Sequence, residues 1–138
     1  MRNEMVKFIT AIGKTLVRSG SSQPLLQRVA EEIVAHLDTR LVRIWTLDST
    51  NETLELQATA GSATIPEEPM DRVPVGAPGV GRIASDMRPH VVDSVVNDPL
   101  VGDRGWVMRE GIVAFAAFPL IVERRLLGVM TTHWFYQI

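Results

Sequence analysis

Cysteine is absent from the 138-residue sequence. Disulfide bridges, thiolate nucleophiles, cysteine-ligated zinc sites and cofactors attached through sulfur are therefore excluded. No apolar stretch approaches the ~20 residues that a membrane-spanning helix needs. The N-terminus carries early charges in place of a signal-peptide core. We therefore expect a cytoplasmic protein without membrane insertion.

A strong excess of charge of either sign is also missing. The formal net charge is −2, so no general attraction to nucleic acid or to an anionic membrane is expected. Hydrophobic residues make up 46 % and charged residues 22 %, which is typical of a globular protein. A chain of this length buries a sizeable core, and we assign residues 1–138 to one domain.

Hydrophobic periodicity predicts two helices at the N-terminal end. Residues 1–18 place apolar side chains at steps of three and four, and Gly20 among serines ends the pattern. A second helix is predicted from residues 22–24, where a hydroxyl can cap the first turn and proline is tolerated, to Leu37. Both apolar stripes are expected to pack against a core.

A period of two follows, which indicates strands. Residues 41–47 and 54–58 are predicted to form one hairpin, and residues 113–122 and 126–133 a second. Between the hairpins, prolines and glycines interrupt regular structure. This middle part is expected to contain edge strands at 71–75 and 90–96, a short helix at 79–87 and one helical turn around Trp106.

The strand predicted at 113–122 is apolar on both faces, so both faces of its sheet must be covered. Hairpins favour antiparallel pairing, and helices gathered at one end of the chain favour an α+β architecture. We expect the N-terminal helices to cover one face. Residues 61–111, with loops and short helices, are expected to cover the other face and to leave room for a cavity.

Several segments match one family when their order and spacing are taken together. They are RIWTLD (43–48), LELQATAG (54–61), VPVG (73–76), GRIASDMRPHVVDSVVNDP (81–99) and WVMREGIVAFAAFPLIVERRLLGVM (106–130). The chain resembles the GAF domain, a small-molecule sensing module, and within that family the GAF domains of bacterial sensor histidine kinases.

The resemblance implies a GAF-like, PAS-related fold, with N-terminal helices on one face of an antiparallel sheet and a ligand pocket over the other. It assigns residues 1–20 to a linker helix that pairs two chains and residues 22–138 to the GAF core. A homodimer is expected through Met5, Phe8 and Ile12. An output domain outside this chain would receive the signal.

Alternation along the first strand selects two candidate pocket residues. Val42 and Ile44 share one face, and Arg43 and Trp45 share the other. Because an arginine does not belong against a helical core, we place Arg43 and Trp45 toward the pocket. The alternative is a solvent-exposed Arg43 with its stem laid over Trp45.

The resemblance extends the pocket to the start of the short helix, the segment around Trp106 and the final hairpin. Small alanines in that hairpin would leave volume for a ligand, or would only let the covering loop come close. The further candidate ligand-binding residues are Gly79, Val80, Trp106, Met108, Ala114, Ala116, Thr131 and His133.

The sequence gives little support for a nucleotide-binding loop, a metal site or a catalytic site. The glycine-rich run at 76–81 lacks the lysine and the hydroxyl residue of a nucleotide-binding loop. His36, His90 and His133 lie far apart in sequence without ligand spacing, so no metal site is predicted. A local hydrogen bond between His90 and Asp93 is expected instead. No nucleophile–base set is present, so we expect no catalytic residues and no enzyme activity.

Departures from known branches of the family exclude several classes of ligand. Bilin attachment and the reductase branch both use cysteine, which is absent. The cyclic-nucleotide signature Asn-Lys…Phe…Asp-Glu is also missing, because Lys7 and Lys14 are the only lysines. No cofactor is predicted. A noncovalent tetrapyrrole on His90 or His133 is compatible with the sequence but has no positive support.

Two hypotheses follow. The first is a sensory module of a two-component system, within a sensor histidine kinase, that binds a small molecule and relays its occupancy. The alternative is a ligand-free GAF domain that serves as a dimerisation scaffold.

Overall fold

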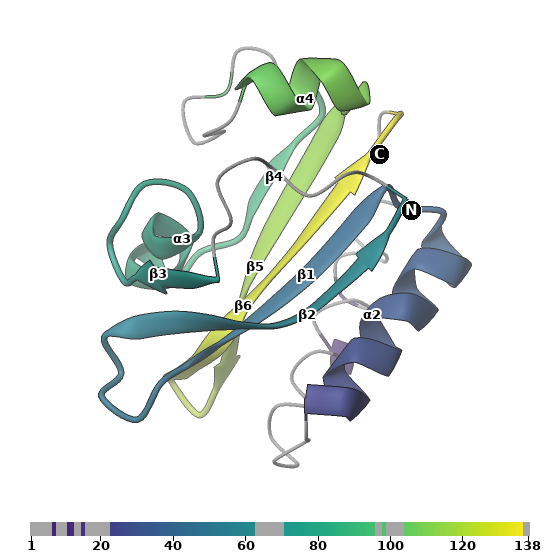
Figure 1. Ribbon diagram of the computed structural model, residues 1–138. Helices are drawn as coiled ribbons and strands as arrows, with labels where there is room; N and C mark the ends of the chain where they lie inside the picture. Colours follow the sequence, from purple (N-terminus) through teal and green to yellow (C-terminus); the bar gives the residue numbers. More distant parts are fainter. Residues whose placement is uncertain are drawn as a thin grey trace.

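Six strands form one antiparallel sheet in the order β3-β2-β1-β6-β5-β4. The computed structural model describes residues 7, 11, 12, 15, 23–62, 71–95, 98 and 104–136. Helix α2 lies along one face, and α3 and α4 lie on the other side (Figure 1). The predicted α+β fold is confirmed. The elements are α2 (Gln23–Leu37), β1 (Leu41–Leu47), β2 (Thr53–Gly61), β3 (Arg72–Pro74), α3 (Val80–Asp86), β4 (His90–Val92), α4 (Arg104–Glu110), β5 (Ala114–Val122) and β6 (Arg125–Trp134).

The face of the sheet that contacts α2, called the back face, is held by apolar packing. Leu26, Ala30 and Ile33 follow one another at helical spacing and pack against Val42 and Ile44 of β1. All five are at most 3 % exposed. Each large apolar side chain buried in this way contributes about 1.5–3 kcal/mol. The predicted cover of one face by the second helix is therefore confirmed.

Little of the first predicted helix is described. Lys7, Ala11, Ile12 and Thr15 are helical, and the Thr15 hydroxyl donates a hydrogen bond to the carbonyl of Ala11 at 2.9 Å. Ile12 is half-buried. The other two residues of the predicted dimer interface, Met5 and Phe8, lie outside the described residues.

The opposite face of the sheet, called the front face, is partly covered by α3. Trp45 of β1 packs there with Ala117 of β5, Val129 of β6 and Ile83 of α3. At the end of the sheet next to α4, Trp106 belongs to a cluster with Leu41, Val95, Val107 and Ile112. The middle of the chain thus supplies the front cover, as expected.

Both faces of β5 are apolar, but the expected assignment of its alternating residues is wrong. Ala114 and Ala116 pack on the back face with α2, whereas Ala117 and the half-buried Phe115 pack on the front face. Strand register decides the assignment, because Ala117 pairs with Thr131. The two alanines expected to leave ligand volume therefore belong to the core beneath α2.

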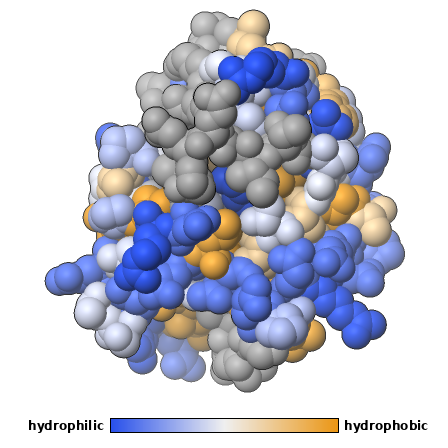
Figure 2. Space-filling model, in the orientation of Figure 1, coloured by the Kyte–Doolittle hydropathy of each residue, from blue (hydrophilic) through white to orange (hydrophobic). Residues whose placement is uncertain are grey.

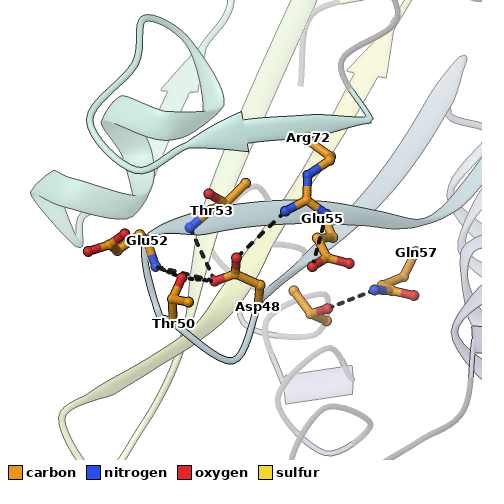
Figure 3. Close-up of polar contacts among 8 residues, drawn as sticks. Asp48, Thr50, Glu52, Thr53, Glu55, Gln57 and Arg72 are labelled. Atoms are coloured by element: carbon orange, nitrogen blue, oxygen red, sulfur yellow. Dashed lines mark hydrogen bonds and ion pairs between the residues drawn. The ribbon is translucent and has the colours of Figure 1, made fainter.

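Side-chain contacts tie β3 to the β1–β2 turn (Figure 3). Asp48 accepts hydrogen bonds from the Thr50 hydroxyl at 2.7 Å and from the backbone N–H of Thr53 at 3.4 Å. Arg72 places Nη2 3.7 Å from Asp48 Oδ2 and Nη1 3.2 Å from Glu55 Oε1. These contacts position the start of the segment that leads into α3.

The surface seen in the orientation of Figure 1 is mostly hydrophilic, with hydrophobic residues in small separate areas (Figure 2). Among the described residues, no helix is long and apolar enough to cross a membrane. Of the large hydrophobic side chains that the structure describes, five are exposed, namely Leu25, Met87, Met108, Phe135 and Tyr136.

Candidate functional site

Three polar side chains lie close together on the front face, on the neighbouring strands β1 and β6. Arg43 of β1 pairs with Thr131 of β6, and Leu41 of β1 pairs with His133 of β6. Because alternate residues of a strand share a face, Arg43, Thr131 and His133 lie on the same side of the sheet. We call these three residues the polar centre.

Arg43 is a buried cation. It is 7 % exposed, and its Nε has no hydrogen-bond partner among the residues that the structure describes. Burial lowers the pKa of the guanidinium, while the negative charge of Asp71 acts in the opposite direction. An arginine remains protonated in such a setting. The alternative of a solvent-exposed Arg43 is therefore wrong.

Thr131 adds a buried hydroxyl beside this cation. Its side chain is 1 % exposed, and Oγ1 has no hydrogen-bond partner within the described ranges. A hydroxyl can donate one hydrogen bond and accept others. Thr131 can therefore meet either a donor or an acceptor placed over the sheet.

His133 completes the polar centre as a neutral ring. Burial, together with the positive charge of Arg43, lowers the pKa of His133 to about 3, and a backbone hydrogen bond at Leu41 acts in the opposite direction. The ring centroid lies 5.3 Å from that of Trp106, edge to face, and 4.8 Å from that of Phe115. Nδ1 is buried without a partner in the described part of the chain.

The structure brings together most of the predicted pocket residues. Arg43, Thr131 and His133 form the polar centre, with Trp45 and Trp106 packed beside it. Gly79, with φ of 83°, precedes α3, and Val80 packs in the cluster around Trp45. Met108 stands apart from this group because it is 67 % exposed on α4.

Sequence reasoning missed Phe115 and Ala117 on the front face. Ala117 pairs with Thr131, and Phe115 pairs with His133. Their strand is apolar at every position of its central part, so hydropathy does not separate its two faces. Only the pairing of this strand with the more polar β6 shows which of its residues face the front.

In the described part of the chain, no group of three or more His, Asp or Glu residues is arranged to hold a metal ion. The expected partner of His90 is corrected. Nε2 of His90 lies 2.8 Å from Oδ2 of Asp98, a carboxylate that is 8 % exposed. The carboxylate that contacts His90 therefore belongs to Asp98, which lies farther along the chain than Asp93.

The model of the GAF domain family matches residues 21–136. The chain belongs to the GAF domain family. No curated protein is significantly similar to it.

Solved GAF-fold structures cover most of the chain at low identity. The GAF domain of a phosphoenolpyruvate-protein phosphotransferase from Coxiella burnetii is 19 % identical, with a TM-score of 0.69 over 96 % of this chain and 78 % of that one. Free methionine-R-sulfoxide reductase from Neisseria meningitidis, in complex with its substrate, is 18 % identical, with a TM-score of 0.66 over 93 % and 72 %.

A third similar structure is the NreA protein of Staphylococcus aureus, mutated in its nitrate binding site. It is 13 % identical, with a TM-score of 0.62 over 80 % of this chain and 83 % of that one. At these identities the likeness shows a shared fold. This fold thus occurs in proteins of diverse activity, and the site itself must carry any functional argument.

Proposed function

We propose that this GAF domain is a regulatory module that binds a small molecule over the polar centre and relays its occupancy to an output domain. A sensor histidine kinase of a two-component system in the cytoplasm is the context that the sequence resemblance favours. We propose binding without catalysis, because the chain has no cysteine for the chemistry of the reductase branch.

Three buried polar atoms that have no hydrogen-bond partner among the described residues carry this proposal: Nε of Arg43, Oγ1 of Thr131 and Nδ1 of His133. A buried polar atom without a partner costs about 1–3 kcal/mol. A domain used only as a scaffold would be more stable with apolar residues at these positions. A ligand that supplies the missing hydrogen bonds removes that penalty.

The similar structures add limited support. The Staphylococcus aureus protein has a nitrate binding site, and the Neisseria meningitidis reductase holds its substrate. Small-molecule binding is therefore compatible with this fold.

Strand β1 offers a direct route from the site to the back of the sheet. Arg43 projects to the front, while Val42 and Ile44 on either side of it pack against α2. A ligand shifts a conformational equilibrium only as far as it binds one state more tightly than the other. A shift of β1 that improves contacts with the ligand would therefore be transmitted to α2.

Thermal unfolding against a metabolite panel tests the proposal. A ligand at about 100 times its Kd raises the free energy of unfolding by about 2.7 kcal/mol, which raises Tm by roughly 10 °C for a domain of this size. We expect at least one compound to give such a shift. If no compound stabilises the protein, the scaffold hypothesis is favoured.

Two neighbouring threonines provide a matched control. Thr131→Val removes the front-face hydroxyl. Thr132→Val removes a hydroxyl on the back face, beside Val42 and Ala116, that is equally buried and likewise has no hydrogen-bond partner among the described residues. Both variants are expected to fold. Only Thr131→Val should weaken ligand binding, by about 1 kcal/mol. If the two variants weaken ligand binding equally, the ligand does not bind over the front-face hydroxyl.

A further inference from the structure

We infer that the ligand presents a negatively charged oxyanion group, either a carboxylate or a small inorganic oxyanion, to the Arg43 guanidinium. This inference rests on the proposed function and names the chemical class of its ligand. It follows from the charge of the polar centre, from the atoms left unpaired and from the surroundings of the cation.

The charge of the polar centre is positive. Arg43 carries it, because His133 is neutral at physiological pH and Thr131 is uncharged. The carboxylate that acts electrostatically on Arg43 belongs to Asp71, whose side chain is exposed to solvent. A cationic ligand would be repelled by Arg43, and a neutral ligand would leave only the exposed Asp71 to compensate the charge of the guanidinium. An anion compensates it.

The unpaired atom of Arg43 fits a planar oxyanion. Guanidinium groups bind carboxylates through two parallel N–H···O bonds, and Nε with one neighbouring Nη forms such a pair of donors. Nε of Arg43 is buried and has no partner in the described ranges. An oxyanion placed side-on against this edge would satisfy it.

The neighbours of the cation add hydrogen-bonding capacity within an apolar frame. Thr131 Oγ1 and His133 Nδ1 are both unpaired within the described residues. Trp45 packs beside Arg43, with the guanidinium carbon 6.0 Å from its ring centroid. Charge-assisted hydrogen bonds are stronger in such buried surroundings than in water. The site therefore suits one anionic group better than a fully hydrated polyanion.

Sodium acetate and sodium nitrate are suitable probes of the two sources of an oxyanion, an organic carboxylate and an inorganic ion. Acetamide is the neutral counterpart of acetate, and sodium chloride at equal ionic strength controls for salt. We expect acetate, nitrate or both to shift the Arg43 Nε–H signal in ¹H–¹⁵N spectra with saturation. Acetamide and chloride should not shift it.

Variants at Arg43 show whether this residue is responsible. Arg43→Met should weaken the binding of the responding anion by at least about 10-fold. Arg43→Lys should recover only part of the binding, because an ammonium group cannot form the planar fork. Arg82→Met is the matched control, since Arg82 is exposed and pairs with Asp86 on α3, and it should bind as the wild type does.

Thermal unfolding without anion tests independently whether Arg43 has a structural partner in the unliganded protein. Because Arg43 is buried and its Nε has no hydrogen-bond partner among the described residues, Arg43→Met is expected to have a Tm equal to or higher than that of the wild type. A lower Tm would mean that Arg43 has a structural partner, which would overturn the argument from its unpaired state. An anion response that survives in Arg43→Met would overturn the inference directly.

Failure of this inference is distinguishable from failure of the proposed function. If acetate and nitrate have no effect while a neutral compound of the metabolite panel stabilises the wild type, the oxyanion class is wrong and the sensory function stands. If no compound of any charge binds, both the inference and the proposed function are wrong.

Discussion

At the residue scale, the guanidinium carbon of Arg43 lies 6.0 Å from the centroid of the Trp45 ring. That distance is the outer limit of a cation–π interaction, which contributes about 0.5–1 kcal/mol at exposed sites. Removing a charge from water costs several kcal/mol when no partner compensates it. Because Asp71 compensates the charge of Arg43 only from an exposed position, we expect Arg43 to weaken the unliganded fold and a bound anion to reverse that effect.

His133 predicts a pH dependence of stability. Its pKa is lowered to about 3 in the folded protein, against about 6.5 in an unfolded chain. The unfolded state therefore binds more protons between these values, so the free energy of unfolding falls as pH is lowered from about 6.5 towards 3, by up to about 1.4 kcal/mol per pH unit. Above pH 6.5, His133 contributes no slope.

Chemical denaturation between pH 5.0 and 6.5, above the range in which most carboxylates titrate, measures this effect. His133→Phe keeps an aromatic ring between Trp106 and Phe115 and should flatten the slope. His36→Gln removes an exposed histidine of α2 and is the matched control. If both variants lose the same slope, the dependence does not arise from the burial of His133.

At the element scale, the close approach of β1 and β6 supports the site. Gly128 of β6 lies where a Cβ atom would meet the carbonyl oxygen of Trp45 and lie 3.1 Å from Cα of Thr46. A side chain at this position would push β6 away from β1. The spacing of the strands that carry Arg43 and Thr131 therefore depends on this glycine.

We expect Gly128→Ala to lower the free energy of unfolding by about 1–3 kcal/mol, as overpacking does in a close-packed region. Gly111→Ala is the control, since its φ of 69° is strained for alanine but no atom lies within 4 Å of the added Cβ. That variant should lose about 1 kcal/mol. Urea unfolding measures both. A Gly128→Ala variant that is as stable as the wild type would contradict the close approach.

At the scale of the whole molecule, the resemblance to other GAF domains implies pairing of two chains through the first helix. Ile12 is half-buried and helical, as the apolar stripe requires, and the stripe also includes Met5 and Phe8. Burying a charge in an apolar interface is strongly unfavourable. A charged residue in the stripe should therefore separate the chains.

We expect the wild type to sediment as a dimer, and Phe8→Glu and Ile12→Glu to sediment as monomers under the same conditions. Thr15→Glu, at an exposed position of the same helical stretch, is the control and should leave assembly unchanged. Sedimentation velocity over a range of concentrations gives the answer. A dimer that persists in both apolar-to-charged variants would exclude the first helix as the interface.

Much of the fold is predictable from local periodicity. Helical spacing in residues 23–37 and period-two alternation in the strands identify α2 and both hairpins. The front-facing position of Arg43 and Trp45 is also predictable, because a charged residue within an alternating strand distinguishes its two faces. Each of these signals lies within one element, where a side chain's direction follows from its position.

Two features of the structure, one of them in the candidate site, were decided only by tertiary structure. His90 contacts Asp98 and not Asp93, which is nearer in sequence. The path of the chain after β4 determines which carboxylate lies beside His90. In β5, both alternating sets of residues are apolar, so either set could face α2 by hydropathy alone. Pairing with β6, irregular between Leu120 and Ile121, places Phe115 and Ala117 at the front. A one-residue change of register exchanges the two faces, and contacts between strands determine that register.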